Sequence, residues 1–252
     1  MIVGKHALVT GGGTGVGRAI ALALAGAGID VTICGRRKEP LDAVTRENGR
    51  VTAIPADVTD EAAMAALFTE AERARGPIDV VVANAGMSGS SPAHRTSLAD
   101  WQHTLAVNMT GSFLTVKPAL AGMTSRKSGR IIFIASTAGL KGYAYVAPYV
   151  AAKHGVIGLM RALATEMART GVTVNAVCPG FVETDMLEES VQRIVEKTGR
   201  TVEQARASLS ATNPQGRFIQ PQEVAAAVLW LCSAEAGSIT GQAISLSGGE
   251  TW

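Results

Sequence analysis

Residues 6–28 read HALVTGGGTGVGRAIALALAGAG and contain a short apolar run, a glycine-rich turn and an apolar helical pattern. A strand, a glycine-rich turn and a helix in this order form the context in which a glycine motif binds a nucleotide. We expect Gly11 to tighten the turn, Gly15 to let the backbone approach a pyrophosphate, and Gly17 to let the helix pack closely on the strand. The N–H groups and the dipole at the start of the helix would favour the phosphates.

The alternation of strands and helices continues to the end of the chain. Apolar runs that we interpret as strands lie at residues 30–34, 51–59, 78–86, 130–136, 172–180 and 242–246, with helical patterns at 60–75, 97–123, 149–169 and 221–233. The run IDVVVANAG is almost continuously apolar, which is typical of a parallel strand buried on both faces. The sequence therefore predicts one α/β domain over residues 1–252. We expect a doubly wound (Rossmann) fold whose parallel sheet has about seven strands, with helices on both faces.

Composition limits the classes of function. The chain has 252 residues, of which 47% are hydrophobic and 17% charged, and its net charge of +2 includes no basic stripe. A large core is therefore expected and a nucleic-acid partner is not. The three cysteines lie far apart in apolar contexts and the four histidines are scattered, so we expect no metal site. Because we find neither a signal peptide nor an apolar span of membrane length, we expect no membrane partner and a cytoplasmic location.

The second predicted strand ends at Gly35, where dinucleotide-binding folds carry an acidic residue that binds the adenosine ribose. Arg36 and Arg37 follow, and an arginine at this place pairs well with the 2′-phosphate of NADP. The alternative is a solvated charge pair that opens a surface helix. The missing acid favours NADP(H) as the cofactor and leaves NAD(H) open. Asp57, at the end of the third predicted strand, is suited to accept a hydrogen bond from an adenine amino group.

Residues 136–153, STAGLKGYAYVAPYVAAK, contain the side chains that we expect to carry out the chemistry. Tyr149 and Lys153 lie four residues apart in a predicted helix, so they share one face, and the ammonium can favour the tyrosinate. A phenol that ordinarily titrates at about 10 would thereby approach the range useful for proton transfer. Ser136 ends the strand RIIFIAS, at the edge of the sheet where ligands bind in open α/β folds. Tyrosine and lysine also share this spacing by chance in many helices, so the remaining motifs have to support the assignment.

Three further features surround this segment. Asn108 lies among apolar neighbours in a predicted helix, where a buried asparagine must be hydrogen-bonded. Thr184 is placed to cap a helix or to touch a ligand. Residues 187–218 are charged, weakly periodic and long, and we interpret them as a substrate lid, with a plain surface excursion as the alternative.

On the basis of these motifs, the chain resembles the short-chain dehydrogenase/reductase family over its whole length. TGGGTGVG resembles the family's TGxxxGxG turn, ANAG its NNAG turn with alanine in place of the first asparagine, and Pro179-Gly180 its PG turn near the nicotinamide. The resemblance implies a catalytic tetrad of Asn108, Ser136, Tyr149 and Lys153. It implies cofactor contacts from Gly11, Thr14, Gly15, Val16, Gly17, Arg36, Arg37, Asp57, Val58, Asn84, Ala85, Gly86, Tyr149, Lys153, Pro179, Gly180, Val182 and Thr184.

Within that family, APYVAAKHGVIGL and TGVTVNAVCPGFVET are most similar to 3-oxoacyl-acyl-carrier-protein reductases and polyketide ketoreductases. The similarity implies reduction of a ketone, a 3-oxoacyl thioester or a related β-keto compound, to a secondary alcohol. Tyr149 would donate the proton and Ser136 would bind the carbonyl oxygen, while Lys153 would lower the tyrosine pKa and hold the nicotinamide ribose. Asn108 would position a water that links Lys153 to solvent. Candidates for contact with the substrate are Met87, Ser88, Ser136, Tyr143, Val146, Tyr149, Phe181 and Met186.

Two alternatives remain for the function. One is an NAD(P)-dependent dehydrogenase that oxidises a small secondary alcohol, and a more remote one is a nucleotide-binding protein without turnover, although all four tetrad positions are intact. By resemblance we also expect a homotetramer. Apolar helices around residues 106–120 and 150–163 would pair across one interface, and the C-terminal ISLSGGETW would lie near another.

Overall fold

A computed structural model describes residues 2–251 of the chain. Within this range seven strands form one parallel sheet in the order β3-β2-β1-β4-β5-β6-β7. The strands are β1 His6–Thr10, β2 Asp30–Cys34, β3 Val51–Ala53, β4 Val80–Ala83, β5 Gly129–Ile134, β6 Val172–Pro179 and β7 Ala243–Leu246. The strand order reverses between β1 and β4, and a crevice is expected at the carboxyl ends of the strands there. The predicted single doubly wound domain is confirmed.

The third strand is shorter than the sequence predicts. The pattern indicates a strand over residues 51–59, but only Val51–Ala53 pairs with β2. The N–H groups of Ile54 and Ala56 still donate to the carbonyl oxygens of Ile33 and Gly35, at 3.0 and 3.2 Å, so the chain stays bonded to β2 beyond the regular strand. Pro55 lies between these two residues on an edge strand and interrupts neither bond. Asp57 therefore lies in the connection beyond β3 and not at the end of the strand.

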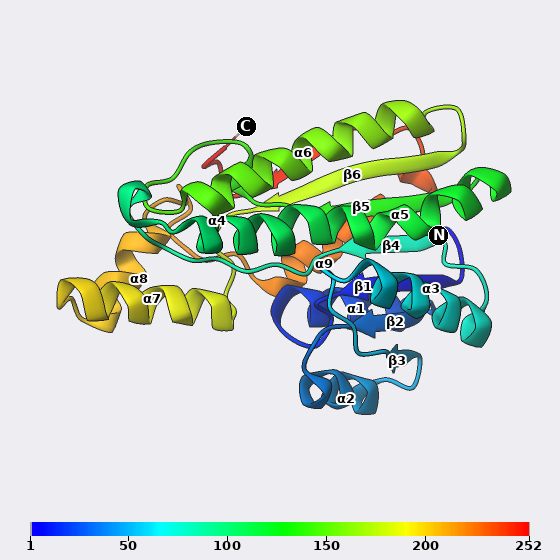
Figure 1. Cartoon of the computed structure of the whole chain (residues 1–252), viewed down its shortest axis with the longest axis horizontal. Helices are drawn as coiled ribbons and strands as arrows, with labels where there is room; N and C mark the ends of the chain where they lie inside the picture. Colours follow the sequence, from blue (N-terminus) through cyan, green and yellow to red (C-terminus); the bar gives the residue numbers. More distant parts are fainter. Residues whose placement is uncertain (1, 252) are drawn as a thin grey trace.

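Helices cover both faces of the sheet (Figure 1). They are α1 Gly15–Gly26, α2 Lys38–Glu47, α3 Glu61–Arg75, α4 Leu98–Leu105, α5 Gly111–Arg126, α6 Ala147–Met167, α7 Asp185–Thr198, α8 Val202–Ser210 and α9 Pro221–Leu231. None of the helices described here has the length and apolar character needed to cross a membrane.

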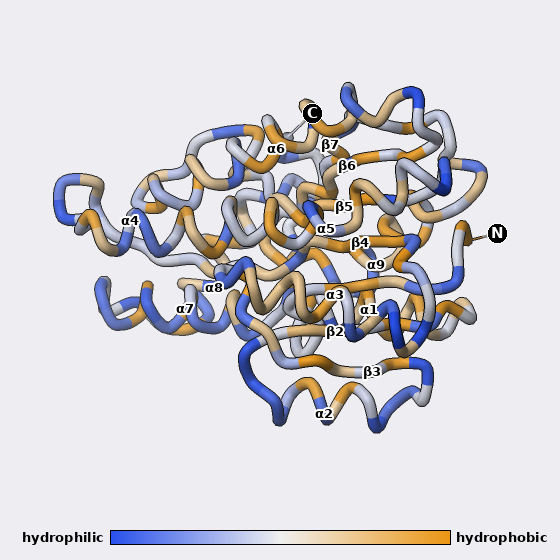
Figure 2. Tube along the Cα trace, turned by 45° about the vertical axis from the view of Figure 1, so that its right-hand side comes forward, coloured by the Kyte–Doolittle hydropathy of each residue, from blue (hydrophilic) through white to orange (hydrophobic). Residues whose placement is uncertain are grey.

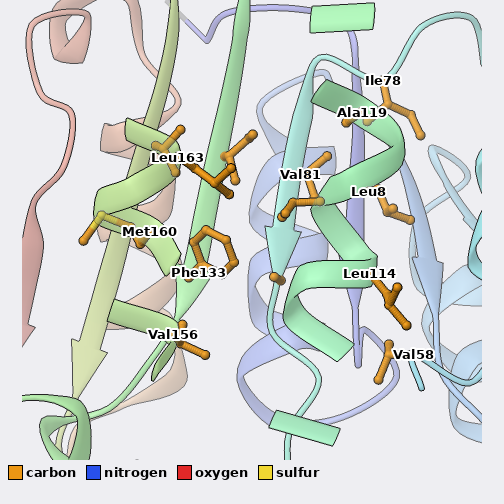
Figure 3. Packing of buried hydrophobic residues seen from close by; sticks show 14 of the residues in the cluster. Leu8, Val58, Ile78, Val81, Leu114, Ala119, Phe133, Val156, Met160 and Leu163 are labelled. Carbon is orange, nitrogen blue, oxygen red and sulfur yellow. The ribbon is translucent and has the colours of Figure 1, made fainter. Parts of the chain in front are cut away.

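Each strand contributes to two cores, because alternate side chains point to opposite faces of the sheet. Leu8 and Phe133 belong to the core under α3, α5 and α6, whereas Val9 and Ile132 belong to the core under α1, α2 and α9. Figure 3 shows the first of these cores, where side chains from α6 lie close to Phe133. In Figure 2 the central strands are correspondingly hydrophobic. Burial on both sides explains why the strands read as nearly continuous apolar runs.

The long helix predicted over 97–123 is continuous helical backbone with a local change of pitch. Ser97 caps α4 by accepting a hydrogen bond from the N–H of Asp100 at 3.0 Å. A π-helical turn, Ala106–Thr110, then joins α4 to α5. Asn108 lies in the middle of this turn and is completely buried. Single π turns inside helices are frequent at functional sites.

The segment interpreted as a lid folds into two helices. α7 begins shortly before it, and α8 follows after Gly199, whose φ of 68° is in the left-handed region. A small separate core of Leu187, Val191, Ala205 and Phe218 holds the two helices together. Figure 1 shows α7 and α8 projecting from the domain, and Figure 2 shows extensive hydrophilic stretches on α7. The sequence of α7 is therefore more periodic than we expected, with Leu187 and Val191 buried on one side of the helix.

Candidate active site

A cleft of about 650 Å³ lies at the carboxyl ends of the central strands. Every residue that the sequence assigns to cofactor, catalysis or substrate lies in its lining. α7, α8 and the turn after α8 add further lining side chains, namely Leu187, Ser190, Arg193, Ile194, Leu209 and Thr212. The volume is typical of a small-molecule site. The fold thus brings the predicted residues together, while their individual roles stay predictions.

Close contacts in the turn between β1 and α1 require glycine. A Cβ added to Gly17 would lie 2.1 Å from the carbonyl oxygen of Gly11, so no side chain fits there. Gly11 itself has a φ of 64°, in the left-handed region that favours glycine. The side-chain amide of Asn84, after β4, donates to the carbonyl oxygen of Thr10 at 2.9 Å. Asn84 lines the cleft as predicted, and its N–H groups also fix the shape of the turn.

The start of α1 fits an anionic group. Thr14, the N-cap residue, makes no side-chain hydrogen bond to the first turn, whose N–H groups have no partners within the helix. Gly15 has a φ of 51°, and a Cβ there would lie 3.1 Å from Cγ2 of Thr184. Thr184 itself donates its hydroxyl to the carbonyl oxygen of Val182 instead of capping α7. Bare backbone and unpaired N–H groups at the positive end of a helix suit a pyrophosphate, so these residues fit a dinucleotide.

Charged side chains from the connections after β2 and β3 line another part of the cleft. Arg36 and Arg37 are exposed at the rim of the cleft. Oδ1 of Asp57 accepts hydrogen bonds from the N–H and the hydroxyl of Thr59, at 2.9 and 2.8 Å. These hydrogen bonds, with a smaller contribution from the charge of Arg36, keep the pKa of Asp57 below its ordinary value. Asp57 is therefore an ionised acceptor near the positive charge of Arg36.

Asn108 uses its side chain to hold the chain that follows β4. Its Oδ1 accepts from the N–H of Met87 at 3.1 Å, and its amide donates to the carbonyl oxygens of Met87 and Thr104 at 3.0 and 2.9 Å. A Cβ on Gly86 would lie 2.8 Å from this Oδ1 and 3.8 Å from Nζ of Lys153, so glycine lets both side chains approach. With its amide engaged in this way, Asn108 positions Met87, and the predicted water relay stays untested.

Tyr149 and Lys153 lie one helical turn apart in α6, and Ser136 follows β5. Nζ of Lys153 lies 5.5 Å from the centroid of the Tyr149 ring and donates a hydrogen bond to the carbonyl oxygen of Ile134 at 2.8 Å. Burial lowers the pKa of Lys153 to about 8. Ser136 accepts a hydrogen bond from the N–H of Ala138 at 3.1 Å, which leaves its own hydroxyl proton available.

The pKa of Tyr149 differs from the sequence-based expectation. The pattern predicts that Lys153 lowers it, but burial is the largest effect and raises it, while a hydrogen bond with Ser136 acts in the opposite direction. The reason is geometric, because the ammonium is directed at Ile134 and lies some distance from the ring. A tyrosine with a raised pKa is protonated at neutral pH, which is the form that a proton donor needs.

Several residues at the cleft escape the sequence analysis. Thr137 and Tyr145 line it, and their nearness to Ser136 and Tyr149 in the sequence is a signal that could have identified them. Tyr145 has a φ of 68°, unusual for a bulky residue, and its carbonyl oxygen accepts from the N–H of Ser91 at 2.7 Å. Arg193 comes from the lid segment, whose sequence gives no sign of which side faces the cleft.

Comparison with known proteins is consistent with this geometry. The sequence matches the family described as short chain dehydrogenase over residues 5–194. It is 39% identical to a 3-oxoacyl-acyl-carrier-protein reductase of Aquifex aeolicus, an alignment that covers 98% of this chain and 97% of that protein. It is 37% identical to a D-beta-hydroxybutyrate dehydrogenase of Cupriavidus necator, with 99% and 98% covered.

A solved structure gives the same result in three dimensions. A single-residue variant of actinorhodin polyketide ketoreductase, crystallised with NADPH, superposes with a TM-score of 0.94. The two chains are 39% identical, and the match covers 98% of this chain and 97% of that one. The similarity therefore extends over both cores, the cleft and the helices beside it.

Proposed function

The chain belongs to the short-chain dehydrogenase family and is an oxidoreductase, and from this we propose that it reduces a β-keto substrate, a 3-oxoacyl thioester or a related compound, with NADPH. One observation carries the proposal. Ser136, Tyr149 and Lys153 converge at the carboxyl end of β5, in the same cleft as a glycine turn flanked by arginines.

The cofactor would be held by groups distributed along the cleft. The glycine turn and the N–H groups of α1 would bind the pyrophosphate, and Asp57 would accept from the adenine. Arg36 and Arg37 favour the 2′-phosphate of NADPH, since Gly35 stands where NAD-binding folds carry an acid. The NADPH in the related ketoreductase structure supports the same preference.

When bound, NADPH would supply the hydride for the carbonyl carbon. Tyr149 would donate its proton to the carbonyl oxygen as negative charge develops there. The hydroxyl of Ser136 would donate to the same oxygen and stabilise that charge. The ammonium of Lys153, 5.5 Å from the ring centroid, would then favour the tyrosinate that is left behind.

The remaining wall of the cleft indicates the class of substrate. Met87, Val146, Phe181 and Met186 give it a partly apolar lining, which suits an acyl chain or ring next to the ketone. α7 and α8 flank this part of the cleft, and we propose that residues 187–218 act as a lid over the substrate. The 3-oxoacyl reductase among the relatives supports a β-keto thioester.

A direct assay tests the proposal. The protein is incubated with NADPH and the acetoacetyl thioester of N-acetylcysteamine, and absorbance of the reduced nicotinamide is followed while the product is identified by mass spectrometry. We expect NADPH consumption and a 3-hydroxy thioester. Tight NADPH binding without consumption of either this thioester or a simple β-keto ester would contradict the proposal and favour a binding protein.

A second candidate function is oxidation of a small secondary alcohol, because one relative is a hydroxybutyrate dehydrogenase. The same assay run in reverse, with 3-hydroxybutyrate and either NAD⁺ or NADP⁺, separates the two. Faster turnover with NAD⁺ and hydroxybutyrate than with NADPH and the thioester would favour this second function.

We also propose a homotetramer. Leu98, Trp101 and Phe113 are exposed apolar side chains on α4 and α5, which include the helical region predicted to pair. Exposed apolar side chains on these neighbouring helices support a surface that another subunit would cover in the assembly. The second predicted interface includes Trp252, which lies outside the described residues. Sedimentation of a monomer would contradict both interfaces.

A further inference from the structure

Tyr143 lines the cleft, but its hydroxyl is fully engaged. The phenol oxygen lies 2.6 Å from Oγ1 of Thr137 and 2.6 Å from Oε1 of Glu250. A phenol has one proton to donate, and the carboxylate can only accept, so the Thr137 hydroxyl supplies the other hydrogen bond. The side chain of Tyr143 is therefore fixed at its polar end, and what it offers to the cleft is the aromatic ring.

Glu250 is the centre of this arrangement. Its side chain is only 2% exposed, and Oε1 also forms an ion pair with Nζ of Lys141 at 3.0 Å. The ammonium of Lys141 lies in turn 5.0 Å from the centroid of the Tyr143 ring, within the range of a cation–π contact. Lys141, Tyr143 and Glu250 thus hold one another, and we refer to these three residues as the clamp.

The clamp joins two parts of the chain, and Glu250 also reaches a third. Lys141 and Tyr143 belong to the loop after β5, and Glu250 belongs to the segment after β7. Oε2 of Glu250 lies 3.2 Å from where a Cβ on Gly180 would be, so it packs against the turn after β6. Glu250 does not line the cleft, so it acts on a substrate through the residues that it contacts, of which Tyr143 is the one with a side chain large enough to form a wall.

Tyr143 stays protonated in this environment. Burial raises its pKa, and the hydrogen bond to Glu250 and the charge of that carboxylate raise it further. Tyr143 and Tyr149 line the same cleft. A substrate placed with its carbonyl at Tyr149 would have its neighbouring substituent close to the Tyr143 ring.

We propose that Glu250 is a positioning residue that holds Tyr143 as a rigid aromatic wall of the substrate pocket, so that the enzyme prefers β-keto substrates with an aromatic or cyclic group beside the ketone. The inference rests on the proposed reductase function and names its substrate class more closely. A pinned ring contributes more to binding than a mobile one, because less side-chain freedom is lost when the substrate stacks on it.

The test compares two β-keto esters that contain the same number of carbon atoms, ethyl benzoylacetate and ethyl 3-oxononanoate. The ratio of their kcat/KM values is measured for the wild type, Glu250→Ala and Tyr143→Phe. We expect the wild type to prefer the aromatic ester and both variants to reduce the ratio about three- to tenfold, mainly through KM. Tyr143→Phe keeps the aromatic ring but loses the hydroxyl that bonds to Glu250. It therefore tests the proposal even if Glu250→Ala folds poorly.

Two controls separate positioning from general damage. Glu250→Gln keeps an oxygen that accepts from Tyr143, and we expect it to retain most of the preference. Glu70→Gln removes a carboxylate from the exposed side of α3 and should leave the ratio unchanged. Affinity for NADPH, followed by fluorescence, should be the same in all variants.

The outcomes distinguish this inference from the function on which it rests. A wild type that reduces both esters, with a ratio that Glu250→Ala and Tyr143→Phe leave unchanged, would overturn the inference alone. A preference of the wild type for the linear ester would also overturn it. A wild type that reduces neither ester would overturn the proposed function and the inference with it.

Discussion

The ammonium of Lys153 donates a hydrogen bond to the carbonyl oxygen of Ile134 at 2.8 Å, which ties α6 to the last residue of β5. Lys153 is only 4% exposed. Burial lowers its pKa from an ordinary 10.5 to about 8, because the charged form loses its hydration. A positive charge is thus kept beside Tyr149 at neutral pH at a cost to the stability of the fold.

This cost predicts how stability depends on pH. Below about pH 8 the lysine is charged in the folded and the unfolded chain, and the penalty of burial is fully present. Between about 8 and 10.5 the folded protein releases the proton while the unfolded chain keeps it, so stability rises with pH. We expect the free energy of unfolding to increase by about 2–3 kcal/mol relative to Lys153→Met over this interval. Urea unfolding of both proteins measures it, and parallel pH profiles would contradict it.

Replacing Tyr149 tests its role as proton donor. Tyr149→Phe removes the hydroxyl that faces Ser136 and should lower kcat about 10²- to 10⁴-fold, the usual contribution of a general acid. The affinity for NADPH should remain nearly unchanged, because the glycine turn and the arginines are untouched. The matched control is Tyr145→Phe, at a tyrosine of the same cleft that is 62% exposed. Retained turnover in Tyr149→Phe would remove the tyrosine from the mechanism.

Much of the fold could be predicted because the signals are local. Apolar runs bounded by glycine turns identified all seven strands of the sheet, and Gly17 is required by its contact with Gly11 in the same turn. The third strand was predicted too long because an apolar run does not mark where regular pairing with β2 stops, after Ala53.

Features that depend on distant contacts could not be predicted in the same way. Glu250 reaches Tyr143 across 107 residues, and no periodicity relates the two. The upward shift in the pKa of Tyr149 arises from burial, which only the packed structure fixes. Asn84 and Asn108 were identified as site residues. The hydrogen bonds by which their side chains hold the backbone depend on where β1, β4 and α4 meet.

Cofactor choice depends on Arg36. If it meets the 2′-phosphate, Arg36→Ala should weaken NADPH binding about ten- to a hundredfold, the worth of charge-assisted hydrogen bonds, and leave NADH binding unchanged. Arg46→Ala is the matched control, since Arg46 is an exposed arginine in the last turn of α2. Fluorescence titration of both cofactors measures the effect. Equal losses for NADPH and NADH, or none, would mean that Arg36 is a surface charge.

Two glycines of α1 provide a comparison of close packing with open space. A Cβ at Gly17 would lie 2.1 Å from the carbonyl oxygen of Gly11, whereas a Cβ at Gly26 would meet nothing within 4 Å. Gly17→Ala should therefore destabilise the fold by about 1–3 kcal/mol, since either the turn or the helix must shift. It should also weaken binding of both NADPH and NADH, because the same turn would hold the pyrophosphate. Gly26→Ala, in the last position of the helix, should be neutral or stabilise by up to about 1 kcal/mol. Urea unfolding with cofactor titration measures both effects, and equal stability of the two variants would show that the turn does not need its close approach to the helix.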